Sequence, residues 1–182
     1  TVYEGDSMKS ILGFNVEAKN SDISIQRVKL ALGTATSIYN KIYSKIYITD
    51  GSNVLASSDL NSSTVIKDGS TYYITVAGFN LIVPKGSKKQ IIVKADVRSQ
   101  IDSGDLGSKT ITLASNGIRG VDGAGIDQYA GDTSITKSVT VSATLVDSAS
   151  LIVTLNTTSP KVQDVICAGA ATENECDKLT LM

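Results

Sequence analysis

Apolar and polar positions alternate most clearly in residues 38–48, which read IYNKIYSKIYI. The isoleucines fall on one parity, and Tyr39, Tyr43 and Tyr47 fall on the other together with two lysines. A β-strand sends successive side chains to opposite faces, so the pattern predicts a strand with an isoleucine face and a tyrosine/lysine face. Isoleucine and tyrosine also recur every four positions, which is the helical alternative. β-branched and aromatic residues, followed by the turn signal Asp50-Gly51, favour the strand.

Similar alternation predicts short strands along most of the chain. We expect them at residues 10–18, 22–32, 53–57, 63–67, 72–76, 79–83, 89–97, 109–114, 117–121, 135–146 and 151–155. The inward parity changes near Gln26-Arg27, which predicts a β-bulge. Asp68-Gly69 and Pro84-Lys85-Gly86 predict turns. Many short strands without a three-turn helix indicate an all-β fold, a β-sandwich of two packed sheets.

Composition excludes several function classes. The chain of 182 residues contains no His, which excludes His-centred triads and His-based acid–base catalysis. Its glutamates lie near the ends or on strand faces, so we expect no carboxylate-pair enzyme. A net charge of −1 argues against nucleic acid as a partner. The sequence has no run of ~20 apolar residues that would span a membrane.

Two cysteines, Cys167 and Cys176, lie close together in the last part of the chain. Zinc normally takes four ligands, so a cysteine pair without His makes a poor zinc site. We expect a disulfide between them, which implies an oxidising compartment and an extracellular location. The alternative is two unpaired thiols.

The two ends of the chain resemble each other. Residues 4–12 and 173–181 both place acidic residues before a lysine and then an apolar segment. We therefore expect a sandwich in residues 1–148 and, in residues 149–182, a connector strand, the start of a following module or an exchanged strand. Chance similarity is the alternative. A lone strand cannot bury its apolar face, so it would pair with its own domain, the next domain or the open sheet edge of a neighbour.

Aspartates gather in a glycine-rich stretch between residues 99 and 132. Carboxylate and carbonyl oxygens are the ligands that calcium prefers, so calcium is the cofactor that these loops could hold. The candidate ligands are Asp102, Asp105, Asp122, Asp127 and Asp132. No EF-hand spacing is present. The alternative, which we favour, is that these aspartates cap turns.

Two further surface features are candidate sites. Tyr39, Tyr43 and Tyr47 could form a partner face, because tyrosine is enriched at interfaces. Alternatively, they form an outer face covered by lysine stems or by a loop. Asn61 and Asn156 begin Asn-x-Ser/Thr triplets, which are glycosylation signals that also arise by chance in a chain rich in Ser and Thr.

Three stretches together resemble a known family. Residues 12–32 (LGFNVEAKNSDISIQRVKLAL), 47–58 (YITDGSNVLASS) and 79–97 (FNLIVPKGSKKQIIVKADV) are similar to the repeated immunoglobulin-like modules of large bacterial cell-surface and S-layer-type proteins. The resemblance covers about half of the chain, residues 8–97. It implies an immunoglobulin-like sandwich that serves as a structural module of a surface array or as an adhesin. Together with the expected connector strand, we expect a subunit of a surface layer, fibre or pilus that pairs with neighbouring modules or copies of itself. A carbohydrate- or host-binding adhesin is the alternative, and no site residue transfers with the resemblance.

Overall fold

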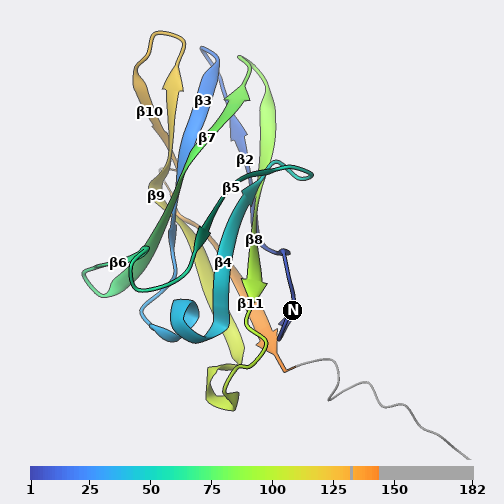
Figure 1. The fold of residues 1–182 in the computed structure, drawn as a ribbon. Coiled ribbons are helices and arrows are strands. Elements are labelled where there is room, and N and C mark those ends of the chain that lie inside the picture. The colour runs from blue at the N-terminus through green and yellow to red at the C-terminus, as the bar shows by residue number, and fades with distance from the viewer. Residues whose placement is uncertain (132, 144–182) are drawn as a thin grey trace, which may run out of the picture. The chain divides into compact units, whose positions relative to one another are not determined.

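The computed structural model describes residues 1–131 and 133–143. Strands account for most of these residues and form two sheets that pack face to face (Figure 1). The predicted all-β sandwich is therefore confirmed. In the described part of the chain the helical elements are two short turns, Ile38–Ile42 and Ser103–Asp105, and no helix there is long and apolar enough to cross a membrane.

The larger sheet has seven strands in the order β1-β11-β9-β3-β7-β6, and β10 pairs with β9 beside this path. Neighbouring strands are antiparallel except β1 and β11, which run parallel. The strands are β1 (Val2–Tyr3), β3 (Ile23–Ala31), β6 (Val65–Asp68), β7 (Thr71–Val83), β9 (Gly107–Asp122), β10 (Asp127–Ala130) and β11 (Ile135–Ser142).

The smaller sheet has four antiparallel strands in the order β2-β8-β4-β5. They are β2 (Lys9–Glu17), β4 (Tyr43–Thr49), β5 (Val54–Asp59) and β8 (Lys88–Val97). The chain passes from one sheet to the other between β2 and β3. It does so again between β3 and β4, β5 and β6, β7 and β8, and β8 and β9. Segments far apart in sequence therefore face each other across the core.

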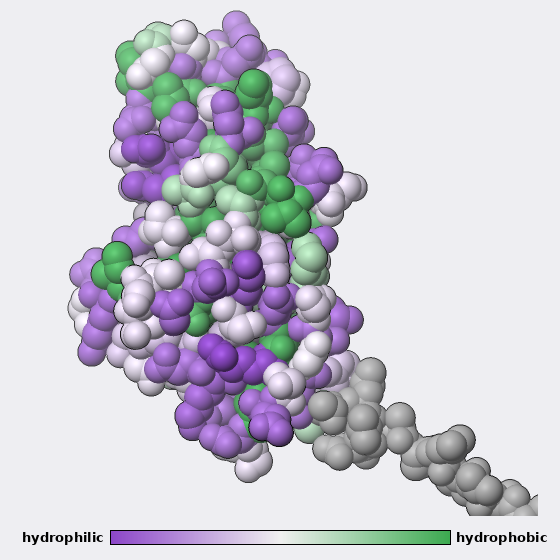
Figure 2. Space-filling view, viewed as in Figure 1, coloured by the Kyte–Doolittle hydropathy of each residue, from purple (hydrophilic) through white to green (hydrophobic). Residues whose placement is uncertain are grey.

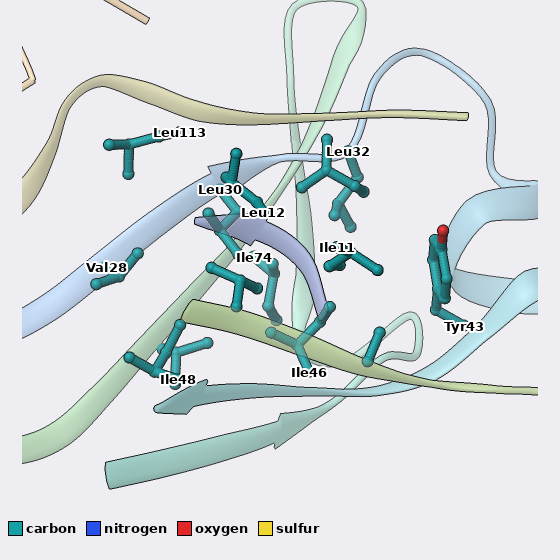
Figure 3. Packing of buried hydrophobic residues seen from close by; sticks show 14 of the residues in the cluster. Ile11, Leu12, Val28, Leu30, Leu32, Tyr43, Ile46, Ile48, Ile74 and Leu113 are labelled. Atoms are coloured by element: carbon teal, nitrogen blue, oxygen red, sulfur yellow. The ribbon is translucent and has the colours of Figure 1, made fainter. Parts of the chain in front are cut away.

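The core consists of the inward side chains of both sheets. Leu12 from β2 points toward Leu30 from β3 and Ile74 from β7 (Figure 3). Leu30 and Ile74 are fully buried, as is Ile46 on β4. Each large aliphatic side chain moved out of water contributes roughly 1.5–3 kcal/mol, so the overlap of the two inner faces is the main source of stability.

The bulge predicted at Gln26-Arg27 is present. The pairing of β3 with both β7 and β9 shifts register between Ile25 and Arg27. The extra residue returns the strand to its inward phase, so that Ile25 and Val28 are both buried. The turn predicted at Asp68-Gly69 lies one residue later, because Asp68 ends β6 and pairs with Thr71, which leaves Gly69-Ser70 as the loop. The turn predicted at Pro84-Lys85-Gly86 lies where expected, after β7.

The single strand predicted for residues 38–48 was wrong in its first half. Residues Ile38–Ile42 form one π-helical turn, and β4 begins at Tyr43. In this half the chain follows the helical alternative, in which isoleucine and tyrosine recur every four positions. One helical turn buries Ile38, Tyr39 and Ile42 together. Other boundaries differ as well: 72–76 and 79–83 are parts of β7, and 109–114 and 117–121 are parts of β9.

Gly117 in β9 provides a test of the packing. A Cβ atom at this position would lie 2.5 Å from the carbonyl oxygen of Ala114 and 2.7 Å from that of Lys29. Both neighbours are backbone atoms, so the strand pair would have to move. We predict that Gly117→Ala lowers the free energy of unfolding by about 2 kcal/mol in urea denaturation.

Gly13 in β2 is the matched control. Its Cβ would meet nothing within 4 Å. Gly13→Ala should therefore change the unfolding free energy by no more than about 0.5 kcal/mol. Equal unfolding midpoints for the two variants would contradict the packing described between β3 and β9.

Candidate functional site: an open groove between the two sheets

The sandwich is not closed along the side bordered by β2 and β11. β2 pairs with β8 on one side, and in the described part of the chain no strand pairs with its other side. β11 pairs with β9 on one side, and β1 covers its other side at Val141 and Ser142. Unpaired N–H and C=O groups on an edge strand are a template for pairing with another chain.

A groove of about 420 Å³ follows this open side. We call it the β2 groove. Its walls are apolar side chains from β2, β3, β7, β9 and β11: Phe14, Val16, Ile23, Ile25, Val83, Leu113, Ile118 and Ile135. Its rim is polar and includes Asn15, Glu17, Lys19, Asn20, Ser21, Asp122 and Gln128. An apolar floor with a polar rim is the composition typical of a binding groove.

The first half of β11 shows that an inward surface is left uncovered. Ile135 pairs with Leu113, and Lys137 pairs with Ile111. Paired residues point to the same face of a sheet, and Leu113 and Ile111 are fully buried in the core. Ile135 nevertheless remains 40% exposed, and Lys137 is exposed as well. The side chains on this strand therefore face the interior at a place that the smaller sheet does not reach.

The other sheet edges are shorter, more polar or interrupted. β6 has four residues, and β5 has six that include Ser57, Ser58 and Asp59. The upper part of β7 is also unpaired on one side in the described chain, and Figure 2 shows a hydrophobic strip beside it, on the side of β8. A bulge at Gly78, with a φ of 87°, breaks that edge. β2 itself has a register shift between Ser10 and Leu12, but its residues 12–17 pair with β8 without interruption. Because bulges and short polar strands discourage pairing, this stretch of β2 is the most receptive of these edges.

A polar cluster fixes the start of β2. The carboxylate of Asp96 on β8 accepts hydrogen bonds from Ser7 Oγ (2.7 Å), the Met8 N–H (2.8 Å) and Tyr47 Oη (2.6 Å). Partial burial opposes ionisation of Asp96, but the hydrogen bonds from Tyr47, Met8 and Ser7 outweigh it and hold its pKa below the ordinary value. The same bond to Asp96, assisted by burial, raises the pKa of Tyr47 to about 12.

The three tyrosines do not form a common exposed face. Tyr39 is 7% exposed and Tyr43 is fully buried, while Tyr47 is half-buried and bonded to Asp96. The helical turn and a register shift between Tyr43 and Lys45 break the parity on which the predicted partner face depended. Burial also raises the pKa of Tyr43 to about 12. The prediction of a Tyr39/Tyr43/Tyr47 partner face is therefore wrong.

Four of the five aspartates proposed for calcium lie in the described residues and serve other partners. Lys41 Nζ lies 2.8 Å from Asp102 and 3.2 Å from Asp105. The hydrogen bond that Lys41 donates to Asp105 lowers the pKa of this carboxyl group. Arg119 lies 3.7 Å from Asp127.

Asp122 closes the turn between β9 and β10. Its carboxylate accepts the N–H groups of Ala124 and Ile126 at 2.9 Å, and the Ile126 bond is the main cause of its lowered pKa. Within residues 1–131 and 133–143 no three acidic, His or Cys side chains gather in a metal-binding cluster. Asp132 lies outside the described residues, so a calcium site stays a prediction.

Of the remaining candidate residues, Asn61 lies in the described part of the chain, and Asn156, Cys167 and Cys176 lie outside it. Asn61 is exposed in the turn after β5, where its side-chain oxygen accepts the N–H groups of Ser63 (2.8 Å) and Thr64 (3.2 Å). Asn156 and the predicted disulfide between Cys167 and Cys176 lie outside the described residues, as do the strand at 151–155 and the connector at 149–182. These stay predictions.

Comparisons with protein-family models, curated proteins and solved structures found no match to this chain. The class that the described residues define is a two-sheet all-β sandwich with a groove along β2 and β11. Sequence reasoning had not identified the β2 groove, and the available signal was slight. The signal was Lys137, a charged residue on the same face of the strand as the buried Val139 and Val141. A charged side chain on the inward face indicates that this face is open to solvent.

Tyr47 tests the polar cluster. Tyr47→Phe removes one hydrogen bond to a charged carboxylate at a half-exposed site, so we predict a loss of about 1 kcal/mol in unfolding free energy at pH 7. Folding lowers the pKa of Asp96, so this contribution is complete above about pH 5 and disappears as the pH falls through the folded pKa. Folding raises the pKa of Tyr47, so the contribution also disappears as the pH rises from about 10 toward 12.

The matched control is Tyr73→Phe, because no hydrogen bond to the Tyr73 hydroxyl is found among the described residues. Urea denaturation from pH 2 to 11 should show a bell-shaped difference between wild type and Tyr47→Phe, and none for Tyr73→Phe. A difference that does not change with pH would contradict the role given to Asp96.

Proposed function

We propose that the chain is a structural module of an extracellular surface assembly, such as a surface layer, fibre or pilus, in which neighbours join by pairing β-strands. The unpaired edge of β2 beside an apolar groove carries this proposal. Residues 12–17 of β2 form a regular edge beside exposed inward side chains, and such an edge favours the addition of another strand. Pairing there would extend the sheet from one copy to the next.

The topology supports an immunoglobulin-like variant of the sandwich. The chain crosses repeatedly between the sheets, and β8 returns between β2 and β4, which come much earlier in the chain. Such crossing connections are typical of immunoglobulin-like domains. They fit the resemblance of residues 12–32, 47–58 and 79–97 to modules of cell-surface proteins. The expected extracellular location follows from the same resemblance and from the Cys167–Cys176 pair.

Truncation tests the proposal. The buried core residues of the described part of the chain run from Val2 to Val141, so removal of residues 149–182 should leave these contacts in place. We predict that the truncated chain retains a strand-rich circular-dichroism spectrum and cooperative unfolding but no longer assembles. Light scattering and negative-stain electron microscopy measure assembly. Normal polymers from the truncated chain, or a full chain that stays monomeric under all conditions, would count against the proposal.

A second candidate function is an adhesin that binds acidic carbohydrate. Here the support is the outer face of the larger sheet, where basic groups lie over aromatic rings. The Lys29 ammonium lies 4.3 Å from the centre of the Tyr73 ring, and the Arg27 guanidinium lies 5.9 Å from that of Tyr129. Tyr129 is 52% exposed. Aromatic faces and cations together suit sugars that carry carboxylate or sulfate groups.

The adhesin candidate makes a separate prediction. Replacing Arg27 and Lys29 with serine should weaken binding to an acidic polysaccharide by at least about tenfold, since two charged contacts are lost. Lys88→Ser, on the other sheet, is the matched control. Surface plasmon resonance on immobilised heparin measures the effect, and unchanged binding in the double variant would remove this candidate.

A further inference from the structure

We propose that the β2 groove accepts residues 151–155 of a neighbouring copy of this chain, which add to β2 as a strand. The inference rests on the proposed function and specifies the contact through which two copies would join. It combines an acceptor, seen in the structure, with a donor segment in the 39 residues that follow position 143. Residues 151–155 read LIVTL, and their pattern is that of a strand.

The acceptor and donor match in length and phase. Residues 14–18, at the end of β2, line the groove, and Phe14, Val16 and Ala18 among them point inward and are each at least nine-tenths buried. A donor paired with this stretch would direct three alternate side chains into the β2 groove. Residues 151, 153 and 155 are Leu, Val and Leu. Five residues span about 17 Å at roughly 3.3 Å per residue, which is the length of the stretch they would pair with.

The groove also supplies the reason for the donor to bind. Ile135 faces the interior from β11 but is 40% exposed, because none of the strands in the described part of the chain lies between β11 and β2 at this level. A donor would remove this apolar surface from water, and it would satisfy the unpaired backbone groups of β2 in the same step. The alternate donor residues, Ile152 and Thr154, would face outward beside Asn15, which is exposed.

The geometry favours a neighbour over the chain's own end. β11 begins at Ile135 in the groove and ends at Ser142, at the opposite end of the open side. There the N-terminal segment closes the side: the Glu4 N–H donates to Ser142 and the Gly5 N–H to Arg98. Figure 1 shows the N-terminus beside the end of β11.

A returning chain would meet two obstacles. It would have to pass the N-terminal segment, and it would then run parallel to β2, because β11 and β2 run in opposite directions. Parallel pairs are less stable per residue than antiparallel ones. A neighbour can approach from solvent and pair antiparallel.

Two single substitutions in the full chain separate donor from acceptor. Val153→Arg places a charge at an inward donor position and leaves the groove intact. Ile135→Arg places a charge in the groove and leaves the donor intact, and Ile135 is exposed enough for the sandwich to fold with this change. Thr154→Arg is the matched control, with the same charge on the outward side of the donor.

We expect neither Val153→Arg nor Ile135→Arg to assemble alone. Mixed together, they should form a one-to-one dimer and stop, because one chain still has a working groove and the other a working donor. Thr154→Arg should assemble like the wild type. Light scattering measures the masses. Hydrogen exchange should show the β2 amides protected by on the order of tenfold or more in assembled wild type relative to Val153→Arg.

The remaining outcomes overturn the inference in distinguishable ways. Assembly of Val153→Arg or Ile135→Arg like the wild type would show that this contact is wrong while the proposed function stands. A wild type that stays monomeric with protected β2 amides would show that the chain fills its own groove, which overturns both the neighbour contact and the assembly. A monomeric wild type with unprotected β2 amides would remove the contact and the proposed function together.

Discussion

Each sheet of this protein can bury its inner face only against the other sheet, and the whole structure depends on how far the two overlap. Where they overlap, side chains such as Leu30, Ile46 and Ile74 are removed completely from water. Where they do not, an inward residue such as Ile135 remains in contact with solvent. Stability and the candidate site therefore have one physical origin, because the groove is the part of the core that the strands of residues 1–131 and 133–143 leave uncovered.

The start of the β2 edge is held in a fixed shape by a polar cluster. Asp96 anchors Ser7 and the backbone of Met8 immediately before β2 begins. Met8 has a φ of 50°, a conformation that residues other than glycine rarely adopt and that persists where the surroundings fix it. The carboxylate supplies that restraint, and Tyr47 restrains the carboxylate in turn. An edge ordered in advance loses less conformational entropy on pairing, which favours association.

Much of the fold was predictable because one rule governs it. Alternation placed β2, β3 and β8 to within one residue at most of their ends, and the change of phase at Gln26-Arg27 located the bulge in β3. The rule failed where the apolar spacing fits both a strand and a helix, as at Ile38 and Ile42. It also failed where Gly78 and Asn116 look like turns but lie within long strands that bend at positive φ. Alternation identifies the inward face of a strand, but it does not tell whether another strand covers that face, so the β2 groove became visible only in three dimensions.

The direct test of strand addition is a cryo-electron microscopy reconstruction of the assembled wild-type chain. We predict continuous density for an extra strand along the outer edge of β2, with apolar side chains directed toward Phe14 and Ile135, and connected to a neighbouring copy. Neighbours that meet through loops, with β2 bordered by solvent, would contradict the idea that these modules are joined by a shared sheet.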